Sequence, residues 1–235
     1  MTRRNTITLK KKQQTDKKIQ YVSAYVRLWA YVMLERPNTD TINFIDCMSN
    51  AGVYRDGDCC TAIEVLKIFS ELADDYPHKS FRVFCNDNDP AKIEILKKIA
   101  AADIVPPKKN VYLFVCQKDV NDYLADLAGN PQVVGQKSIF AYGTSTILYV
   151  DPFDFGTVEI PKVSAVLQNH YCELIFNFFT SDYTRNFAKD QGRITRCLGG
   201  KTISSREELI KYMRSQLRIG HIEYLFAYRF KTQKN

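Results

Sequence analysis

The stretch Thr146-Ile147-Leu148-Tyr149-Val150-Asp151-Pro152-Phe153-Asp154-Phe155-Gly156 decides how this chain folds. It begins with an apolar run, which is typical of a parallel strand buried on both faces. An acid, a proline and two aromatic residues follow, and a glycine closes the stretch. In open α/β sheets, ligands bind just beyond the carboxyl ends of the strands. Residues 151–155 are therefore predicted to project into a site, unless Asp151 merely caps the next helix.

Strand-like and helix-like segments alternate on both sides of this stretch. A leading amphipathic helix is expected from about residue 16 to residue 34, with Pro37 ending it. Alternating strands and helices indicate right-handed βαβ units. We predict an α/β fold: a doubly wound, mainly parallel Rossmann-like sheet with helices on both faces. The predicted strands are 42–47, 81–85, 111–116, 147–150 and 174–179, and the predicted helices that follow the first strand are 61–73, 91–101, 121–127, 158–169 and 204–219.

The end of the chain predicts an incomplete hairpin. Residues 222–230 alternate like a sixth strand, and the polar residues 231–235 resemble the start of a turn with no partner strand after it. We therefore expect a basic N-terminal arm over residues 1–18 and one Rossmann-like domain over residues 19–235 that lacks its terminal strand.

The composition limits the class of protein. The chain has 235 residues, 45% of them hydrophobic, and no apolar run approaches the roughly 20 residues of a membrane span. Its N-terminus is basic and polar, unlike a secretory signal. The seven cysteines and three histidines show no metal-ligand spacing. We expect a reduced, cytoplasmic protein with no metal and no membrane contact.

The formal net charge of +7 is concentrated at the N-terminus. Such a cluster can meet nucleic acid phosphates, although a terminal run of charge is more often a solvated arm. The seven basic residues of the arm are Arg3, Arg4, Lys10, Lys11, Lys12, Lys17 and Lys18.

Acidic residues end four consecutive predicted strands. Asp46 ends the first and is followed by a loop that contains Gly52, where a nucleotide-like ligand is normally held. Asp87 follows the second strand, where an acid commonly accepts the hydroxyls of a ribose. Asp119 follows the third, where it either accepts from an adenine amine or caps the next helix. With Asp151 after the fourth, these acids fit a ligand that carries an amine, a ribose and an adenine, such as S-adenosylmethionine.

These motifs resemble those of the three-Cys-motif partner proteins. The resemblance covers residues 18–230 and includes a helix with Tyr25 and Trp29. The family's loop Phe-Ala-Gly-Pro-Gly is here residues 48–52 and has lost one glycine, and its Asp-Pro-Tyr-Gly turn contains two additional residues here. The matching segments are Phe44-Ile45-Asp46, Ala51-Gly52-Val53-Tyr54, Gly57, Phe84-Cys85-Asn86-Asp87, Val150-Asp151-Pro152-Phe153, Gly156 and Ile175-Phe176-Asn177-Phe178.

The resemblance implies a class I S-adenosylmethionine-dependent methyltransferase, encoded beside a protein with three cysteines. Asp151 and the Pro152 carbonyl would accept from an amine, and Phe153 or Phe155 would stack on a flat base. An amine on a nucleic acid base is therefore the expected acceptor. The alternative is a nonenzymatic partner that keeps the fold and binds the three-cysteine protein, which the altered glycine loop favours. The residues assigned to the cofactor are Asp46, Ala51, Gly52, Tyr54, Asp87 and Asp119.

Overall fold

One parallel sheet organises the chain. The computed structural model describes residues 10–101, 108–130, 132–133, 135, 137–178 and 180–226, and within them five strands pair in the order β3-β2-β1-β4-β5. All four pairings are parallel. The direction of winding reverses between β1 and β4, which is where open α/β sheets bind ligands. The strands are β1 (Thr41–Asp46), β2 (Ser80–Asp87), β3 (Val111–Gln117), β4 (Thr144–Val150) and β5 (Glu173–Phe176).

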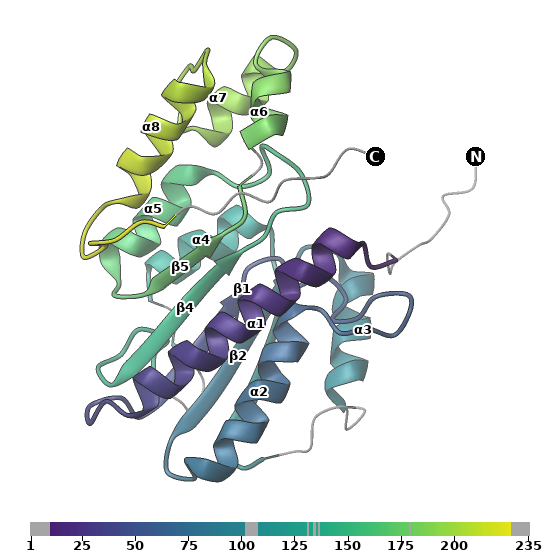
Figure 1. The fold of residues 1–235 in the computed structure, drawn as a ribbon, viewed down its shortest axis with the longest axis vertical. Coiled ribbons are helices and arrows are strands. Elements are labelled where there is room, and N and C mark those ends of the chain that lie inside the picture. The colour runs from purple at the N-terminus through teal and green to yellow at the C-terminus, as the bar shows by residue number, and fades with distance from the viewer. Residues whose placement is uncertain are drawn as a thin grey trace.

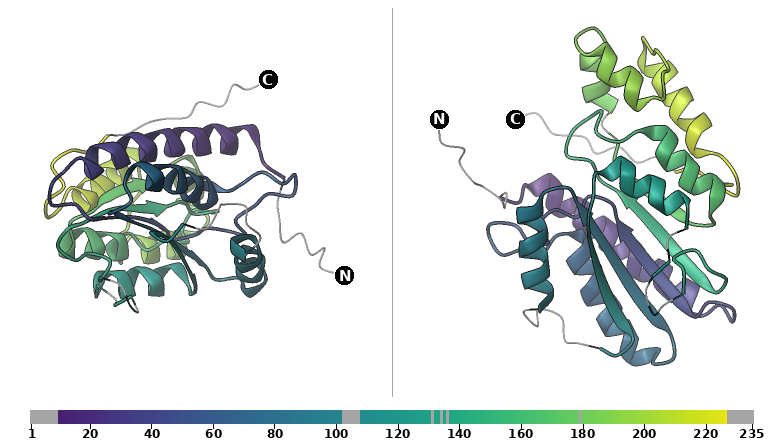
Figure 2. Two further views of the ribbon diagram at one scale, coloured as in Figure 1. Left: turned by 90° about the horizontal axis from the view of Figure 1, so that it is seen from below. Right: turned by 180° about the vertical axis from the view of Figure 1, so that it is seen from behind.

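Helices cover both faces of this sheet, and Figure 2 shows α1 and α2 on one side with α4 and α5 on the other. The predicted doubly wound α/β architecture is thus confirmed. The helices that precede β5 are α1 (Gln13–Leu34), α2 (Thr61–Asp75), α3 (Pro90–Ala101), α4 (Val120–Ala128) and α5 (Ile160–Asn169), and those that follow it are α6 (Thr180–Asn186), α7 (Gln191–Cys197) and α8 (Arg206–Leu217).

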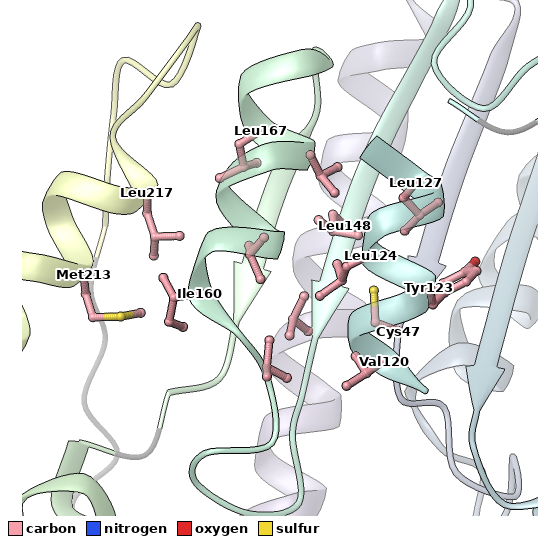
Figure 3. Close-up of a cluster of buried hydrophobic side chains, with 14 of the residues drawn as sticks. Cys47, Val120, Tyr123, Leu124, Leu127, Leu148, Ile160, Leu167, Met213 and Leu217 are labelled. Carbon is pink, nitrogen blue, oxygen red and sulfur yellow. The ribbon is translucent and has the colours of Figure 1, made fainter. Parts of the chain in front are cut away.

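Successive side chains of a strand point to opposite faces of the sheet, so neighbouring residues belong to two different hydrophobic cores. In β1, Phe44 packs with α1 and α2, whereas Ile45 packs with α4 and α5. Figure 3 shows the second core, in which Leu148 of β4 lies beside Leu124 of α4 and α8 contributes Met213. Both faces of the central strands are buried, which accounts for their continuous apolar sequence.

The helix α1 is also hydrogen-bonded to β5, the strand at one edge of the sheet. The Tyr25 hydroxyl and the Trp29 indole Nε1 both donate hydrogen bonds to the carboxylate of Glu173, the first residue of β5. This contact spans 144 to 148 residues of sequence. It holds α1 across the face that includes β4, so that the N-terminal end of the helix reaches the carboxyl end of the sheet.

The predicted boundaries of the strands and helices that the structure contains are correct to within three residues, and the clearest differences have physical causes. The fifth helix begins at Ile160 instead of residue 158, with Pro161 in its first turn, where a missing amide is tolerated. Helices α6 and α7 were not predicted. Each has seven residues, too few to display a helical stripe, and each is mostly polar.

The predicted sixth strand is wrong over the part that the structure describes. Residues 222–226 form no strand, and Tyr224 and Phe226 are exposed. A strand exists only through hydrogen bonds to a neighbour, and no described strand pairs with this segment. Residues 227–230, the rest of the predicted strand, and the predicted turn at 231–235 lie outside the described residues.

The helices α6 and α7 stand beyond the end of the sheet at which the strands terminate (Figure 1). They follow β5 directly and contact the turn after β4 through Tyr183, whose hydroxyl accepts from the Gly156 amide. Among the described residues, no helix is long and apolar enough to cross a membrane, and no three His, Cys, Asp or Glu side chains are grouped to hold a metal ion.

Candidate functional site

Three of the four predicted strand-end acids come together at the carboxyl end of the sheet. Asp46 ends β1, Asp87 ends β2 and Asp151 follows β4, and these strands are direct neighbours. The charges of Asp87 and Asp151 both reach Asp46. Parallel strands end at one edge of a sheet, so residues that are up to 105 positions apart meet in one cluster because of topology alone.

The loop after β1 contains two residues in the left-handed region. Asn50, where the motif of the resembled family has a glycine, has φ of 58°, and Gly52 has φ of 79°. Asparagine is one of the few residues with a side chain that tolerates this left-handed conformation. A Cβ at residue 52 would lie 2.6 Å from Leu96 Cδ1, so the Leu96 side chain would have to shift to admit any other residue. Ala51, between them, is fully buried.

Asp87 connects this loop to β2. Its Oδ2 accepts from the Asn50 amide at 3.1 Å, and its Oδ1 accepts from the Asp89 amide at 3.0 Å. The Lys92 ammonium lies 3.5 Å from Oδ2. Asp89 caps α3 by accepting from the Ala91 amide, as predicted. Each Asp87 oxygen still has a second lone pair, which can accept from a ligand hydroxyl.

Asp46 is a buried acid with an unusual pKa. Its side chain is 2% exposed, and burial raises its pKa to about 8, a direction that the charges of Asp151 and Asp87 reinforce. The Met48 amide donates to Oδ1 at 3.1 Å, and the Lys18 charge also opposes the rise. At neutral pH the folded protein therefore holds Asp46 mainly in its protonated form.

Asp151 accepts hydrogen bonds from three donors on three elements. The Asn177 amide Nδ2, just after β5, donates to Oδ1 at 2.8 Å, and the Tyr149 hydroxyl donates to Oδ2 at 3.1 Å. The third donor is the Lys18 ammonium of α1, which forms an ion pair with Oδ2. Asp151 does not cap a helix in any hydrogen bond of the described residues, so the capping alternative is wrong.

Lys18 is the site residue that sequence reasoning missed. It was counted with the basic arm, but α1 carries it into the cluster, where its side chain is 21% exposed. Lys11 pairs with Asp16 and Asp58. Two lysines of the predicted arm are thus engaged within the protein, and residues 1–9, with Arg3 and Arg4, lie outside the described residues. A partly buried acid after β4 implies a cation nearby, and this expectation was the available indication that a lysine such as Lys18 lies in the site.

The two aromatic residues of the turn have different surroundings. Phe153 is 52% exposed, and the Lys92 ammonium lies 4.8 Å from the centre of its ring. Phe155 is 9% exposed and packs edge-on against Tyr183, with the Arg193 guanidinium 4.7 Å from its ring centre. Pro152, between Asp151 and Phe153, is buried. Only Phe153 has a face available for a ligand.

Asp154 and Phe155 of the turn contact α7. Arg193 forms an ion pair with Asp154 at 2.8 Å while its guanidinium covers Phe155. The Cys197 thiol lies 2.7 Å from the Gly156 carbonyl oxygen. The two additional residues therefore dock the turn on the helices that follow β5.

The remaining predicted residues lie at the margins of the cluster. Asp119 is exposed and caps α4 by accepting from the Asn121 amide at 2.8 Å, so its capping role is confirmed. It also lines a cleft of about 370 Å³ together with Arg193 and Arg196. Tyr54 is half-buried, and burial together with the neighbouring Cys60 thiol raises the pKa of its hydroxyl.

The sheet order and the strand-end cluster define a Rossmann-like α/β protein with an acidic site at the switch point. No family model and no curated protein matches the chain. Among solved structures, the chain is similar to the crystal structure of MnmC2 from Aquifex aeolicus, with a TM-score of 0.35 and 12% sequence identity. The similarity covers 60% of this chain and 42% of that chain, so less than half of that chain's length is matched. Membership of the three-Cys-motif partner proteins stays a prediction from the motifs.

Proposed function

We propose that the protein is an S-adenosylmethionine-dependent methyltransferase whose acceptor is an amine. The observation that supports this most strongly is the cluster of Asp46, Asp87 and Asp151 beside a left-handed loop at the switch point of the sheet. An acidic site of this kind suits a cationic ligand with hydroxyl groups. S-adenosylmethionine supplies an electrophilic methyl group on a sulfonium when it is bound.

The residues present fit such a cofactor. Asp87 is held rigidly by two amides and can accept from both ribose hydroxyls. Asp46 can receive the cationic amino group of the cofactor, which would favour its ionised form and release a proton. Ala51 and Gly52 bring backbone close to the ligand, and Tyr54 would close the same side. Asp119 retains its second carboxylate oxygen for the adenine amine.

Asp151 would bind the acceptor amine. Its carboxylate already holds one amine, the ammonium of Lys18, in a position set by Asn177 and Tyr149. An acceptor amine that replaced Lys18 would donate to Asp151 and to the Pro152 carbonyl, which directs its lone pair away from both. Methyl transfer depends mainly on such positioning. In this proposal Phe153, not Phe155, stacks on the acceptor.

A nucleic acid base is the acceptor that this turn suits best, because Phe153 offers an exposed aromatic face beside an amine-binding acid. Stacking of a base on an aromatic side chain contributes about 1–3 kcal/mol. A base in a duplex would have to leave the stack to reach Asp151. The charge of +7 favours a polyanionic partner.

Calorimetry with S-adenosylmethionine and S-adenosylhomocysteine tests cofactor binding. We expect Asp87→Ala to weaken binding more than tenfold, because hydrogen bonds to a charged group contribute about 1.5–3 kcal/mol. Asp89→Ala is the matched control, since it removes an acid two residues away that only caps α3. A wild-type chain that binds neither compound at millimolar concentration would rule out the proposed cofactor.

Transfer of a labelled methyl group tests the acceptor site. Asp151→Asn should abolish transfer and leave cofactor affinity within a few-fold, because Asp151 meets the acceptor. Phe153→Ala should raise KM for the acceptor, whereas Phe153→Tyr should restore it. If Asp151→Asn transfers methyl groups at the wild-type rate, the assignment of the acceptor site is wrong.

A second candidate is a nonenzymatic partner of a three-cysteine protein. The observation that favours it is the Lys18–Asp151 ion pair, since an internal ammonium already fills the proposed acceptor position. Lys18→Gln discriminates between the two. In an enzyme it would alter KM or kcat for the amine, whereas in a partner protein it would leave binding to the three-cysteine protein unchanged and no acceptor would be methylated.

A further inference from the structure

We infer that the exposed basic face of residues 180–201, a segment that contains α6 and α7, binds the backbone phosphates of a single-stranded nucleic acid whose base reaches the turn after β4. This inference rests on the proposed function and adds the surface that recognises the substrate. Residues 180–201 contain five basic side chains and two acidic ones, Asp182 and Asp190. The basic side chains are Arg185, Lys189, Arg193, Arg196 and Lys201.

Most of this charge faces solvent. Arg185, Lys189, Arg196 and Lys201 are exposed, and Arg193 is partly buried. Within the part of the chain that the structure describes, Lys189, Arg196 and Lys201 take part in no ion pair, whereas Arg185 pairs with Asp182. Positive charge that the protein itself does not neutralise is available for phosphate, and a guanidinium can contact phosphate through two parallel hydrogen bonds.

The face is joined to the turn that carries the proposed acceptor site. Arg193 and Arg196 are three residues apart in α7, so they lie on one side of the helix. Both line the 370 Å³ cleft, together with Gly156 of the turn and the acids Asp119 and Glu159. Arg193 also pairs with Asp154. A strand bound along α7 would therefore pass beside Asp154 and Gly156 of this turn.

Position separates this face from the other basic segments. Lys98 lies in the last turn of α3, and Lys109 is two residues before β3, so both are at the amino end of the sheet. They are exposed and, among the described residues, form no ion pair. They match Lys189 and Arg196 in charge and exposure but are remote from the turn. General attraction by net charge would involve both pairs equally, whereas a substrate surface would involve only Lys189 and Arg196.

The test compares two double variants of the full chain, Lys189→Gln with Arg196→Gln and Lys98→Gln with Lys109→Gln. Binding of a fluorescein-labelled single-stranded RNA, and of the DNA of the same sequence, is measured by anisotropy across a salt titration. Each lost phosphate contact should reduce the slope of log K against log salt by about 0.7, which corresponds to roughly fivefold weaker binding at 0.1 M salt. We expect the lower slope and the weaker binding only in the Lys189→Gln, Arg196→Gln variant, at the size that corresponds to two lost phosphate contacts.

Calorimetry with S-adenosylmethionine on the same proteins separates this inference from the proposed function. Nucleic acid binding that depends on Lys189 and Arg196 in a chain without cofactor affinity would support the surface and contradict the methyltransferase. Wild-type protein that binds cofactor but neither nucleic acid, or whose two double variants lose affinity equally, would overturn the surface alone. A preference for RNA or for DNA identifies the polymer without changing the inference.

Discussion

The two ends of the sheet differ in the buried charged groups that they contain and in the groups that surround them. At the amino end, Arg82 is fully buried, and its guanidinium donates to Asn43 Oδ1 at 2.7 Å and to the carbonyl oxygens of Lys137 and Ser138. Asn43 is held in turn by the Ile139 carbonyl and by Thr146. Burial lowers the pKa of Arg82 to about 10, so the group stays charged at neutral pH.

At the carboxyl end, the buried groups are acids, and lysine ammonium groups oppose them. Asp46 accepts from one amide; the charges of Asp151 and Asp87 raise its pKa, and the charge of Lys18 lowers it. Asp87 and Asp151 accept from amide or hydroxyl donors, and each also pairs with a lysine. The amino end thus holds one cation with neutral acceptors, whereas the carboxyl end gathers three acids whose charges are opposed by lysines.

The largest expected effect concerns the amino end. Arg82→Ala should reduce the free energy of unfolding by about 3 kcal/mol or more, because it leaves buried acceptors without a donor and removes packed side-chain volume. Urea denaturation measures this. Lys137→Gln is the control, since its exposed ion pair with Asp40 contributes at most about 1 kcal/mol. Equal effects for both variants would contradict a structural role for the buried cation.

Next in size is the pH dependence that arises from the carboxyl end. Because the folded-state pKa of Asp46 is raised to about 8, the folded chain binds more protons than the unfolded chain from about pH 4 to pH 8. The protonated Asp46 side chain therefore contributes to the free energy of unfolding fully below the unfolded pKa. This contribution is lost as the pH rises through 8, and the free energy of unfolding falls by up to about 1.4 kcal/mol per pH unit.

Asp46→Asn, which mimics the protonated acid, should remove this component of the slope. Urea denaturation at several pH values between 5 and 8 provides the measurement. The Lys18 charge opposes the rise in pKa and the charges of Asp151 and Asp87 reinforce it, so Lys18→Gln should steepen the decline at high pH. An unchanged pH profile in Asp46→Asn would mean that Asp46 is ionised in the folded protein.

A smaller effect is expected in the loop after β1. Gly52→Ala should destabilise the chain by about 1–3 kcal/mol, because alanine is strained at this φ and its Cβ meets Leu96 at 2.6 Å. Gly57→Ala is the matched control: it has φ of 88°, but nothing lies within 4 Å of its Cβ. If thermal unfolding shows the same loss for both, the close approach to α3 does not limit residue 52.

The smallest effect concerns Asn50, the residue of this loop that has a side chain and a left-handed φ. Asn50→Gly should change stability by no more than about 0.5 kcal/mol, because it relieves the left-handed φ and adds chain entropy to the unfolded state. Cofactor affinity should also stay within a few-fold, since the Asn50 amide that binds Asp87 is retained. A large gain in affinity would indicate that the asparagine side chain obstructs the ligand.

The sequence alone was sufficient for the sheet. Apolar, β-branched runs such as Ile147–Val150 follow from burial on both faces, and the alternation with helices implies parallel pairing, because these signals are local. The same locality identified Asp46, Asp87 and Asp151 as strand ends. It also produced the wrong sixth strand at 222–226, since alternation without a neighbour forms no sheet.

Only the tertiary structure decided which charges meet. Lys18 belongs to the leading helix and Asp151 lies 133 residues later, and no local pattern links them. Likewise, no local pattern links the two members of the cation–π contact between Lys92 and Phe153 or of the ion pair between Arg193 and Asp154. Such pairs depend on how far α1, α3 and α7 extend past the ends of the strands, which is set by packing across the whole sheet. The sequence therefore determined where the acids of the site stand, and the fold decided which cations oppose them, because an ion pair is a long-range contact that no sequence period encodes.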